Sequence, residues 1–452
     1  MNNLPTITIL GAGYVGLTTG SILAQAGYQT YLIEPNQKRL ATIKSGRSFF
    51  FEDGLDTLIE KGLKTKMLLP TDSYAHSIPQ SDIIFSCVGT PDNPDGSPNL
   101  EYVFEAAKTA LQYLKPKAIY VQKSTVPVGT GNRLIDIFAK SGLKVDYLSN
   151  PEFLREGTAI ADTLYPDRII IGGDSSAAIS TLTDLYRRVE LNRQAIAELS
   201  GIANQAKVCR YISTELSSAE LIKVTANAFL AMKISFANSI AILSDQVDAD
   251  VVEIMDGIGL DPRIGTAFLR AGRGYGGGCF PKDVSGLVSS AQDHGVELKL
   301  MRSTQEINAK MPGYIIDKLK TRLTTLKNKQ IIILGLSFKA GTSDTRMSPG
   351  IALANICAKN QASITVFDPI VNREDLDQLD TSTRIVDSIS ELPANPDAII
   401  IATEWPEFCN FTPTQIINLL GKEGILVDAI NAYNPKSLAQ YDIRYIGVGR
   451  RS

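Results

Sequence analysis

The feature that most constrains the fold is a glycine-rich turn near the start of the chain. Residues 6–10, with the sequence TITIL, predict a buried strand, an apolar helical segment follows the turn, and residues 31–33 form an apolar stretch. The turn reads GAGYVG, and its residues in order are Gly11, Ala12, Gly13, Tyr14, Val15 and Gly16. This order of strand, glycine turn, helix and strand predicts the first half of a doubly wound, mostly parallel α/β sheet.

The same turn predicts the cofactor. Gly11 makes a tight turn, Gly13 lets a pyrophosphate approach the backbone, and Gly16 lets the helix pack against the strand. Glu34 ends the second strand, 18 residues after Gly16, where an acid accepts hydrogen bonds from ribose hydroxyls. Because the charge of Glu34 would repel a 2′-phosphate, the sequence favours NAD over NADP.

The last third of the chain repeats this architecture. Four predicted strands lie there, at residues 330–334, 365–367, 398–402 and 425–427. This region has no GxGxxG pattern, so we expect it to bind a nucleotide part of the substrate. Residues 215–248 contain neither Gly nor Pro and predict one long, largely buried helix between two Rossmann-like domains. We therefore expect a NAD-binding domain at residues 1–212, a central helical dimerisation region at 213–310, and a C-terminal domain for the nucleotide part of the substrate at 311–452.

Composition limits the function classes. The 452 residues carry a net charge of -3, which argues against nucleic acid or a membrane surface as a partner. No run of ~20 apolar residues predicts a membrane span, and the first residues show no signal-peptide pattern, so we expect a cytoplasmic protein. The five cysteines form no CxxC pair, and the two histidines, His76 and His294, belong to no motif. Neither a metal site nor Ser-His-Asp chemistry is therefore expected.

Cys279 is the candidate nucleophile. It follows the sequence GYGGG at residues 274–278 and precedes Pro281, which suits the first turn of a helix. A thiol at a helix N-terminus is favoured as the reactive thiolate, and Lys282 adds a second positive charge. With the carboxylate of Asp283 downstream, this pattern indicates covalent catalysis on a bound substrate. The alternative is a buried structural cysteine beside a glycine-rich turn.

Other candidate site residues are predicted from their positions on one face of a helix or in loops that follow strands. Lys223 and Asn227 lie four residues apart in the long predicted helix, so they share one face and can form a site. The alternative is a lysine that only reaches solvent. Two loops, which contain Thr90 and Thr125, follow predicted strands at residues 82–86 and 118–122, and open α/β sheets bind their ligands at such ends. Ordinary connecting loops are the alternative for both.

Together the motifs resemble the UDP-glucose/GDP-mannose dehydrogenase family, over essentially the whole chain. The further matching segments are NPEFLREG at 150–157, PDR at 166–168, ELIK at 220–223, RIG at 263–265 and RMSP at 346–349. The CFPKD sequence that follows GYGGG, with RIG upstream, is similar to the members that act on UDP-glucose. Members that act on GDP-mannose or a UDP-N-acetyl-hexosamine usually vary this segment.

The resemblance implies a four-electron oxidation of a sugar CH₂OH group to a carboxylate, with two NAD and a thiohemiacetal and thioester on the cysteine. The catalytic residues it implies are Cys279, Lys223, Asn227, Asp283, Glu152 and Thr125. It implies cofactor contacts from Gly11, Gly13, Tyr14, Val15, Gly16, Glu34, Lys38, Thr90, Thr125, Glu156, Lys282 and Arg346. Substrate contacts are implied for Glu152, Phe153, Leu154, Lys223, Asn227, Arg263, Tyr275, Gly276, Gly277, Cys279, Phe338 and Lys339. It also implies a homodimer, in which Arg263 reaches the substrate of the neighbouring subunit.

The chain departs from the family pattern at several positions. Glu34 stands where Asp is frequent, Asp53 where Pro is common, Ser343 where Asp is frequent, and Met347 where Glu is frequent. Residues 429–430 are Ala-Ile instead of Gly-Arg, so an arginine that would contact substrate is missing. Because most of these changes fall in the predicted C-terminal domain, GDP-mannose and UDP-N-acetyl-hexosamines stay open as substrates. A non-catalytic nucleotide-sugar sensor is a further alternative, against which the complete catalytic set speaks.

Overall fold

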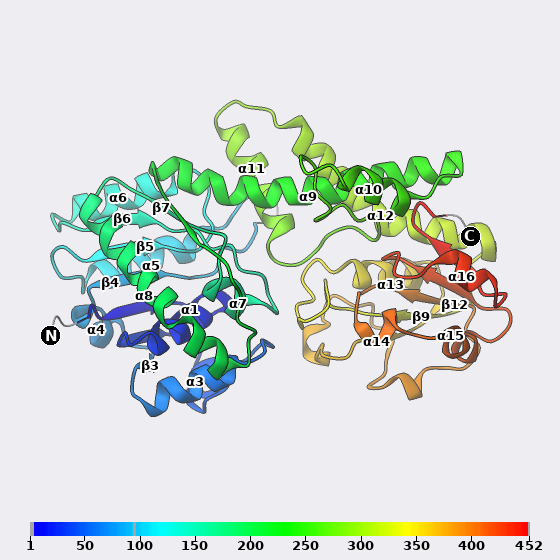
Figure 1. Cartoon of the computed structure of the whole chain (residues 1–452), viewed down its shortest axis with the longest axis horizontal. Helices are drawn as coiled ribbons and strands as arrows, with labels where there is room; N and C mark the ends of the chain where they lie inside the picture. The colour runs from blue at the N-terminus through cyan, green and yellow to red at the C-terminus, as the bar shows by residue number, and fades with distance from the viewer. Residues whose placement is uncertain (1–3, 94–95, 451–452) are drawn as a thin grey trace. The chain divides into compact units, whose positions relative to one another are not determined.

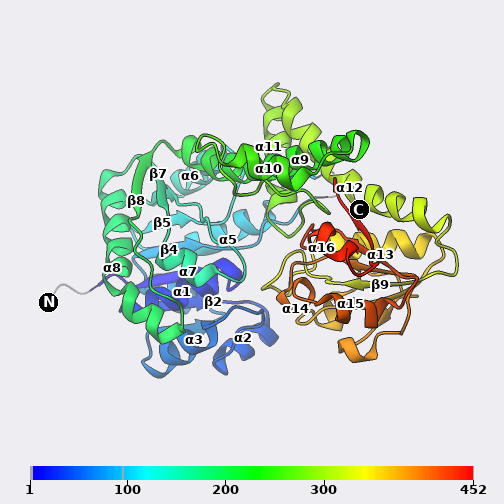
Figure 2. The same cartoon turned by 45° about the vertical axis from the view of Figure 1, so that its right-hand side comes forward.

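The computed structural model describes residues 4–93 and 96–450, so the outermost residues of the predicted first and third domains lie outside the described part of the chain. The chain divides into two compact units, each with one sheet (Figures 1 and 2). The first unit ends at Ala226 and takes in Ser285–Ser290, while the second holds Asn227–Val284 and resumes at Ala291. The predicted boundaries at residues 212 and 310 stay a prediction.

The first unit contains an eight-stranded sheet in the order β3-β2-β1-β4-β5-β6-β7-β8. The strands are β1 (Ile7–Leu10), β2 (Thr30–Ile33), β3 (Leu68–Thr71), β4 (Ile83–Ser86), β5 (Ile119–Gln122), β6 (Asp146–Ser149), β7 (Arg168–Gly172) and β8 (Arg210–Thr214). The first six are parallel, in the order 3-2-1-4-5-6 of a dinucleotide-binding sheet. The pair β6–β7 is antiparallel, and β8 runs parallel to β7.

Helices cover both faces of this sheet, because its central strands are apolar on both sides. The helices are α1 (Tyr14–Gln25), α2 (Gln37–Lys44), α3 (Leu55–Lys64), α4 (Tyr74–Ser77), α5 (Glu101–Leu111), α6 (Thr130–Lys140), α7 (Ala159–Leu164) and α8 (Ser176–Ser200). On β4, Ile83 and Phe85 pack in the layer of α1, α3 and α8, whereas Ile84 packs in the layer of α5 and α6. The sheet is therefore a buried layer whose carboxyl edge carries the loops.

The second unit contains a six-stranded, wholly parallel sheet in the order β11-β10-β9-β12-β13-β14. Its strands are β9 (Gln330–Leu334), β10 (Ser363–Phe367), β11 (Arg384–Ile385), β12 (Ala398–Ile401), β13 (Ile425–Asp428) and β14 (Arg444–Gly447). Its helices are α10 (Val251–Gly259), α12 (Lys299–Leu323), α13 (Pro349–Lys359), α14 (Pro406–Cys409), α15 (Pro413–Leu420) and α16 (Pro435–Ala439). Counted from the first strand of each unit, these six strands have the same order as the first six strands of the first unit, which confirms two Rossmann-like domains.

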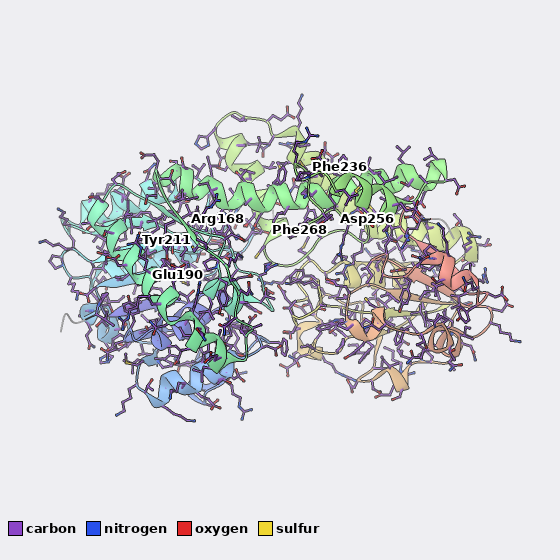
Figure 3. The ribbon with its side chains drawn as sticks, in the orientation of Figure 1. Arg168, Glu190, Tyr211, Phe236, Asp256 and Phe268 are labelled. Carbon is purple, nitrogen blue, oxygen red and sulfur yellow. The ribbon has the colours of Figure 1, made fainter. Side chains whose placement is uncertain are left out.

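Two helices extend across the division between the units: α9 (Leu216–Val247) and α11 (Phe280–Asp293). Helix α9 confirms the long predicted helix, but the prediction that it is largely buried is wrong. Phe229, Phe236 and Leu243 are 55%, 48% and 55% exposed (Phe236 is labelled in Figure 3). Their spacing of seven places them along one stripe of the helix.

Helix α9 is also the one helix in the described part of the chain that is long and apolar enough to cross a membrane. Length and composition alone support that reading, and 39% of its apolar window is buried inside the protein. Core helices of soluble proteins meet the same criteria, so this is weak evidence for a membrane span.

Candidate active site

The glycine turn of the first unit closes at the carboxyl end of β1. Gly11 has a φ of 88°. A Cβ on Gly16 would stand 1.9 Å from the Gly11 carbonyl oxygen, so that position admits no side chain. At Gly13 nothing lies within 4 Å of where a Cβ would stand, so a ligand can approach. Because the turn leads into the N-terminus of α1, its backbone N–H groups suit the pyrophosphate of a dinucleotide.

Glu34 lies at the end of the neighbouring strand β2 and is 5% exposed. Its Oε1 accepts a hydrogen bond from the backbone N–H of Asn36 at 2.9 Å, which fixes the carboxylate at the carboxyl edge of the sheet. A carboxylate held there can accept hydrogen bonds from ribose hydroxyls. Three other predicted cofactor residues of this unit lie in segments that follow strands: Thr90 after β4, Thr125 after β5 and Glu156 after β6. Lys38 lies in the first turn of α2, the helix that follows β2.

We expect Glu34→Ala to weaken discrimination between the two dinucleotides. The variant loses the acceptor for the ribose hydroxyls and the charge that repels a 2′-phosphate, so NAD should bind about tenfold more weakly while NADP binds at least as well. Titration calorimetry with both dinucleotides measures this, with the exposed Glu60→Ala as a control that should leave both affinities unchanged. An unaltered affinity ratio in Glu34→Ala would mean that the ribose is recognised elsewhere.

The Tyr14 side chain has a role that the sequence did not predict. Its hydroxyl donates to Oε2 of Glu52 at 2.6 Å and accepts from the backbone N–H of Gly157 at 2.6 Å. Its ring stacks on Phe50 with centroids 4.2 Å apart. Glu52 is itself buried, and that burial raises the pKa of its carboxyl. Tyr14 thus ties the dinucleotide turn to the loop that carries Glu156.

Glu152 and Lys223 form a buried ion pair in the first unit. Oε1 of Glu152 lies 3.1 Å from Nζ of Lys223, and the two side chains are 9% and 4% exposed. Oε2 of Glu152 accepts from the backbone N–H of Leu154 at 2.7 Å. Lys223 also lies over the ring of Phe153, 5.3 Å from its centroid, as does Arg168 at 3.9 Å (Arg168 is labelled in Figure 3). A buried, partnered lysine excludes the alternative of a side chain that only reaches solvent.

A pocket in the first unit opens beside this ion pair, and its lining includes Glu152, Phe153 and Arg168. Its inner wall holds Lys123, whose Nζ donates to the hydroxyl of Tyr186 at 3.0 Å and to Oδ1 of Asn150 at 3.3 Å. Burial disfavours the charge of Lys123, but the neighbouring Tyr186, Cys87 and Glu152 outweigh it and raise the pKa. Lys123 belongs to no motif, and only its place directly after β5 could have indicated a role.

Asp283 is the centre of the site residues in the second unit. It is 2% exposed, its Oδ2 accepts from Nδ2 of Asn227 at 2.6 Å, and its Oδ1 lies 2.7 Å from Nζ of Lys282. Its backbone N–H donates to the carbonyl oxygen of Cys279 at 2.8 Å. Cys279 is exposed and stands immediately before Phe280, the first residue of α11. The thiol therefore has the position at a helix N-terminus that the sequence predicted.

The glycine run before Cys279 is explained by contact with another loop of the second unit. A Cβ on Gly276 would stand 2.2 Å from the carbonyl oxygen of Met347, and one on Gly278 would stand 2.4 Å from Cζ of Arg346. At Gly277 a Cβ would meet the ring of Phe338 at 2.8 Å. These glycines let two segments of the protein pack closely against each other. The sequence had been interpreted differently, as glycines that allow a ligand to approach the backbone. Tyr275 is 7% exposed, and its backbone N–H donates to Asn308 at 2.7 Å.

The predicted binding cations of the second unit differ in their surroundings. Arg346 binds the carboxylate of Asp344 through two guanidinium nitrogens, at 2.8 and 2.6 Å, and its side chain is 61% exposed. Arg263 binds Asp261 in the same way and is 87% exposed. Lys339 lies over the ring of Phe338, 5.8 Å from its centroid. The sequence also missed Arg273, which is buried and bonded to Thr403, Glu404 and the Phe338 carbonyl oxygen.

Comparison with known proteins finds the same family of dehydrogenases in all three parts of the chain. Family models of the UDP-glucose/GDP-mannose dehydrogenase family match in three parts: the NAD binding domain at residues 5–190, the central domain at 217–310, and the UDP binding domain at 332–435. UDP-glucose 6-dehydrogenase YwqF of Bacillus subtilis (strain 168) is 36% identical over 449 residues, which are 99% of this chain and 98% of that protein. UDP-glucose 6-dehydrogenase of Rhizobium meliloti (strain 1021) is 36% identical over 456 residues, covering 98% of this chain and 99% of that protein.

Solved structures agree with these matches. A UDP-glucose dehydrogenase from the hyperthermophilic archaeon Pyrobaculum islandicum superposes with a TM-score of 0.88 at 30% identity, covering 99% of this chain and 98% of that one. A UDP-D-ManNAc dehydrogenase from Pyrococcus horikoshii has a TM-score of 0.85 at 27% identity, covering 98% and 99%.

Proposed function

The chain belongs to the UDP-glucose/GDP-mannose dehydrogenase family, and we propose that it oxidises C6 of UDP-glucose to the carboxylate of UDP-glucuronate with NAD. It is an NAD-dependent enzyme that acts on a nucleotide sugar. The observation that carries the choice of UDP-glucose is the full-length similarity to UDP-glucose 6-dehydrogenases. When bound, NAD accepts a hydride from C6 in each of two rounds.

In the first round, the C6 hydroxyl must lose its proton as C6 loses hydride. We assign the stabilisation of the resulting alkoxide to Lys223, a buried cation, and to Asn227, a neutral donor. Asp283 and a water held near Thr125 are the candidates to take the proton. The product of this round is an aldehyde at C6.

In the second round, the sulfur of Cys279 bonds to the aldehyde carbon and forms a thiohemiacetal. Loss of the second hydride from carbon, together with the proton of the adduct's hydroxyl group, turns this adduct into a thioester. Glu152 then activates a water, the C–S bond breaks, and the thiolate leaves as the carboxylate forms. The covalent bond keeps the aldehyde from diffusing away while NADH is exchanged for fresh NAD.

Initial rates with different nucleotide sugars test the substrate. With purified protein and excess NAD, UDP-glucose should give the highest kcat/KM, ahead of GDP-mannose and the UDP-N-acetyl-hexosamines. A higher kcat/KM for GDP-mannose or for a UDP-N-acetyl-hexosamine would identify that nucleotide sugar as the substrate instead. The substitutions at Ser343, Met347 and residues 429–430 would then be the first positions to revert. No turnover with any of them would favour a nucleotide-sugar sensor.

We further propose that the protein is a homodimer joined through α9. The exposed side chains of Phe229, Phe236 and Leu243 form a stripe with heptad spacing, which is the pattern that packs against a second helix. Lys233 of the same helix donates to the carbonyl oxygens of Ile264 and Gly265, so the turn that carries Arg263 is fastened to α9. A second copy on this stripe would bring Arg263 near the partner, in agreement with its expected reach.

Phe236→Glu should convert the dimer into a monomer. The variant places a charge in the middle of the apolar stripe, and desolvating an unpaired carboxylate costs several kcal/mol. Sedimentation equilibrium should give twice the 49.0 kDa chain mass for the unaltered protein and the single chain mass for the variant. Leu191→Glu, at an apolar residue of α8 that is 86% exposed, should stay dimeric. A dimeric Phe236→Glu variant would show that α9 is not the interface.

A cytoplasmic location is part of the same proposal. The mechanism needs the exposed thiol of Cys279 in its reduced form, and such thiols persist in reducing compartments.

A further inference from the structure

Glu220 is a buried carboxylate for which the reaction described above has no role. It lies on α9, three residues before Lys223, and is 3% exposed. Its Oε2 accepts from the backbone N–H of Gly129 at 2.7 Å, and its Oε1 accepts from the backbone N–H of Gly131 at 2.8 Å. Both oxygens are therefore bonded to the start of α6, within the first unit.

These bonds replace a cap that α6 lacks. The residue that precedes the helix, Gly129, has no side chain, and its φ of 88° is the left-handed conformation that favours glycine. The first N–H groups of a helix need an acceptor from elsewhere, and a negative charge there is favourable. A Cβ on Gly131 would stand 3.0 Å from Oε1 of Glu220 and 2.8 Å from the ring of Tyr147, so glycine is needed for this approach.

The loop between β5 and α6, which carries Thr125, is thus held at both ends. At its start, the hydroxyl of Ser124 donates to the carbonyl oxygen of Val88 at 2.6 Å. At its end, Glu220 binds Gly129 and Gly131. One turn further along α9, Lys223 binds Glu152 in the loop after β6. The first part of α9 therefore fixes two loops at the carboxyl edge of one sheet.

We propose that Glu220 is a positioning residue, whose ionised carboxylate holds the Thr125 loop in register with Lys223 and Glu152, and whose protonation loosens that loop. The inference rests on the proposed function, because Thr125, Lys223 and Glu152 are assigned to the oxidation. It adds a residue that need not touch substrate or cofactor and acts through the backbone of α6.

The protonation of Glu220 falls near neutral pH. Burial raises the pKa of its carboxyl to about 7, although the N–H groups of Gly131 and Gly129 oppose that shift. The ionisable group that faces it is Tyr147 on β6, behind which lies Tyr120 on β5; the charge of Glu220 raises the pKa of Tyr147, although less than burial does. Well above pH 7 the carboxylate is ionised and accepts both bonds. Below that pH a proton occupies one oxygen, and the two bonds weaken.

Glu220→Gln tests this inference, because the amide replaces one of the two acceptor oxygens with an NH₂ donor, which cannot accept from the second N–H group. With UDP-glucose and NAD, we expect kcat about tenfold below the unaltered enzyme near pH 8, where misplacement of a catalytic group is costly. Near pH 6 the unaltered enzyme is itself mostly protonated at Glu220, so the ratio of the two rates should fall toward one. Proton-dependent steps elsewhere affect both proteins equally and cancel in this ratio.

Two further variants and one measurement separate positioning from simple stability. Glu220→Asp still titrates, so its activity relative to the unaltered enzyme should vary less with pH than that of Glu220→Gln. Glu215→Gln, at an exposed acid just before α9, should leave the rate unchanged at every pH. Hydrogen exchange near pH 8 should be faster at residues 124–135 in Glu220→Gln.

A rate ratio for Glu220→Gln that is constant with pH, together with unaltered exchange at residues 124–135, would overturn the inference. The proposed function would be unaffected, because it is judged by the unaltered enzyme. If that enzyme does not oxidise UDP-glucose, the proposed function itself fails, while the exchange measurement still reports on the contact between Glu220 and α6.

Discussion

Cys279→Ser should abolish formation of the acid while leaving NAD binding intact. Serine has nearly the same size, but its hydroxyl is far less nucleophilic than a thiolate at neutral pH, so the thiohemiacetal does not form. Loss of an activated nucleophile lowers kcat by roughly 10⁴-fold or more. Cys279 is not among the residues expected to contact the cofactor, and serine keeps nearly the same volume, so the affinity for NAD should not change.

Chromatographic detection of the acid and a parallel NAD titration measure both outcomes. Cys409→Ser is the matched control, because it removes another thiol of the second unit that is only partly buried and has no part in the reaction. It should retain near-normal turnover. Acid formation by Cys279→Ser at the rate of the unaltered enzyme would exclude covalent catalysis by this residue.

Lys223→Met should have the second largest effect, on activity and stability together. Methionine fills similar space but cannot stabilise an alkoxide, so we expect kcat to fall about 10³-fold. It also leaves Glu152 buried without its 3.1 Å partner, which should lower the free energy of unfolding by about 3 kcal/mol. Steady-state rates and urea unfolding measure the two effects.

The double variant Glu152→Gln with Lys223→Met separates these effects. Removing both charges relieves the buried, unpaired carboxylate, so the double variant should regain most of the lost stability and none of the activity. If Lys223→Met lost stability but kept its activity, the lysine would be a structural partner of Glu152 and would have no part in the chemistry.

The parts of the fold that the sequence predicted are those with strong local signals. Residues 6–10, 82–86 and 118–122 became β1, β4 and β5 because central strands of a parallel sheet are apolar on both faces. The edge strands β3 and β8 were not predicted, because both are partly exposed and β3 includes Pro70. The exposed stripe on α9 was not predicted for a different reason. The residue type alone does not distinguish an apolar side chain that packs in a core from one that is exposed on the surface of a helix.

Some residues of the candidate site could likewise be predicted from local motifs, whereas contacts between distant segments could not. The sequence predicted Cys279, Asp283, Lys223 and Glu152 because their residue types and motifs carry the chemistry. It could not predict that Tyr14 holds Glu52, because contacts between distant segments leave no local signal. The cap that Glu220 gives α6 lies equally outside local patterns, although Gly129 and Gly131 are visible as glycines. For the same reason, the glycines of residues 274–278 indicated close approach but not what approaches.

The yield of NADH per sugar tests the central claim most directly. Purified protein is given limiting UDP-glucose and excess NAD, and the reaction is followed to completion at 340 nm. Two hydride transfers from one carbon predict about two NADH for each UDP-glucose, with UDP-glucuronate as the product. A yield of about one NADH, with an aldehyde as the product, would contradict a four-electron oxidation through a thioester on Cys279.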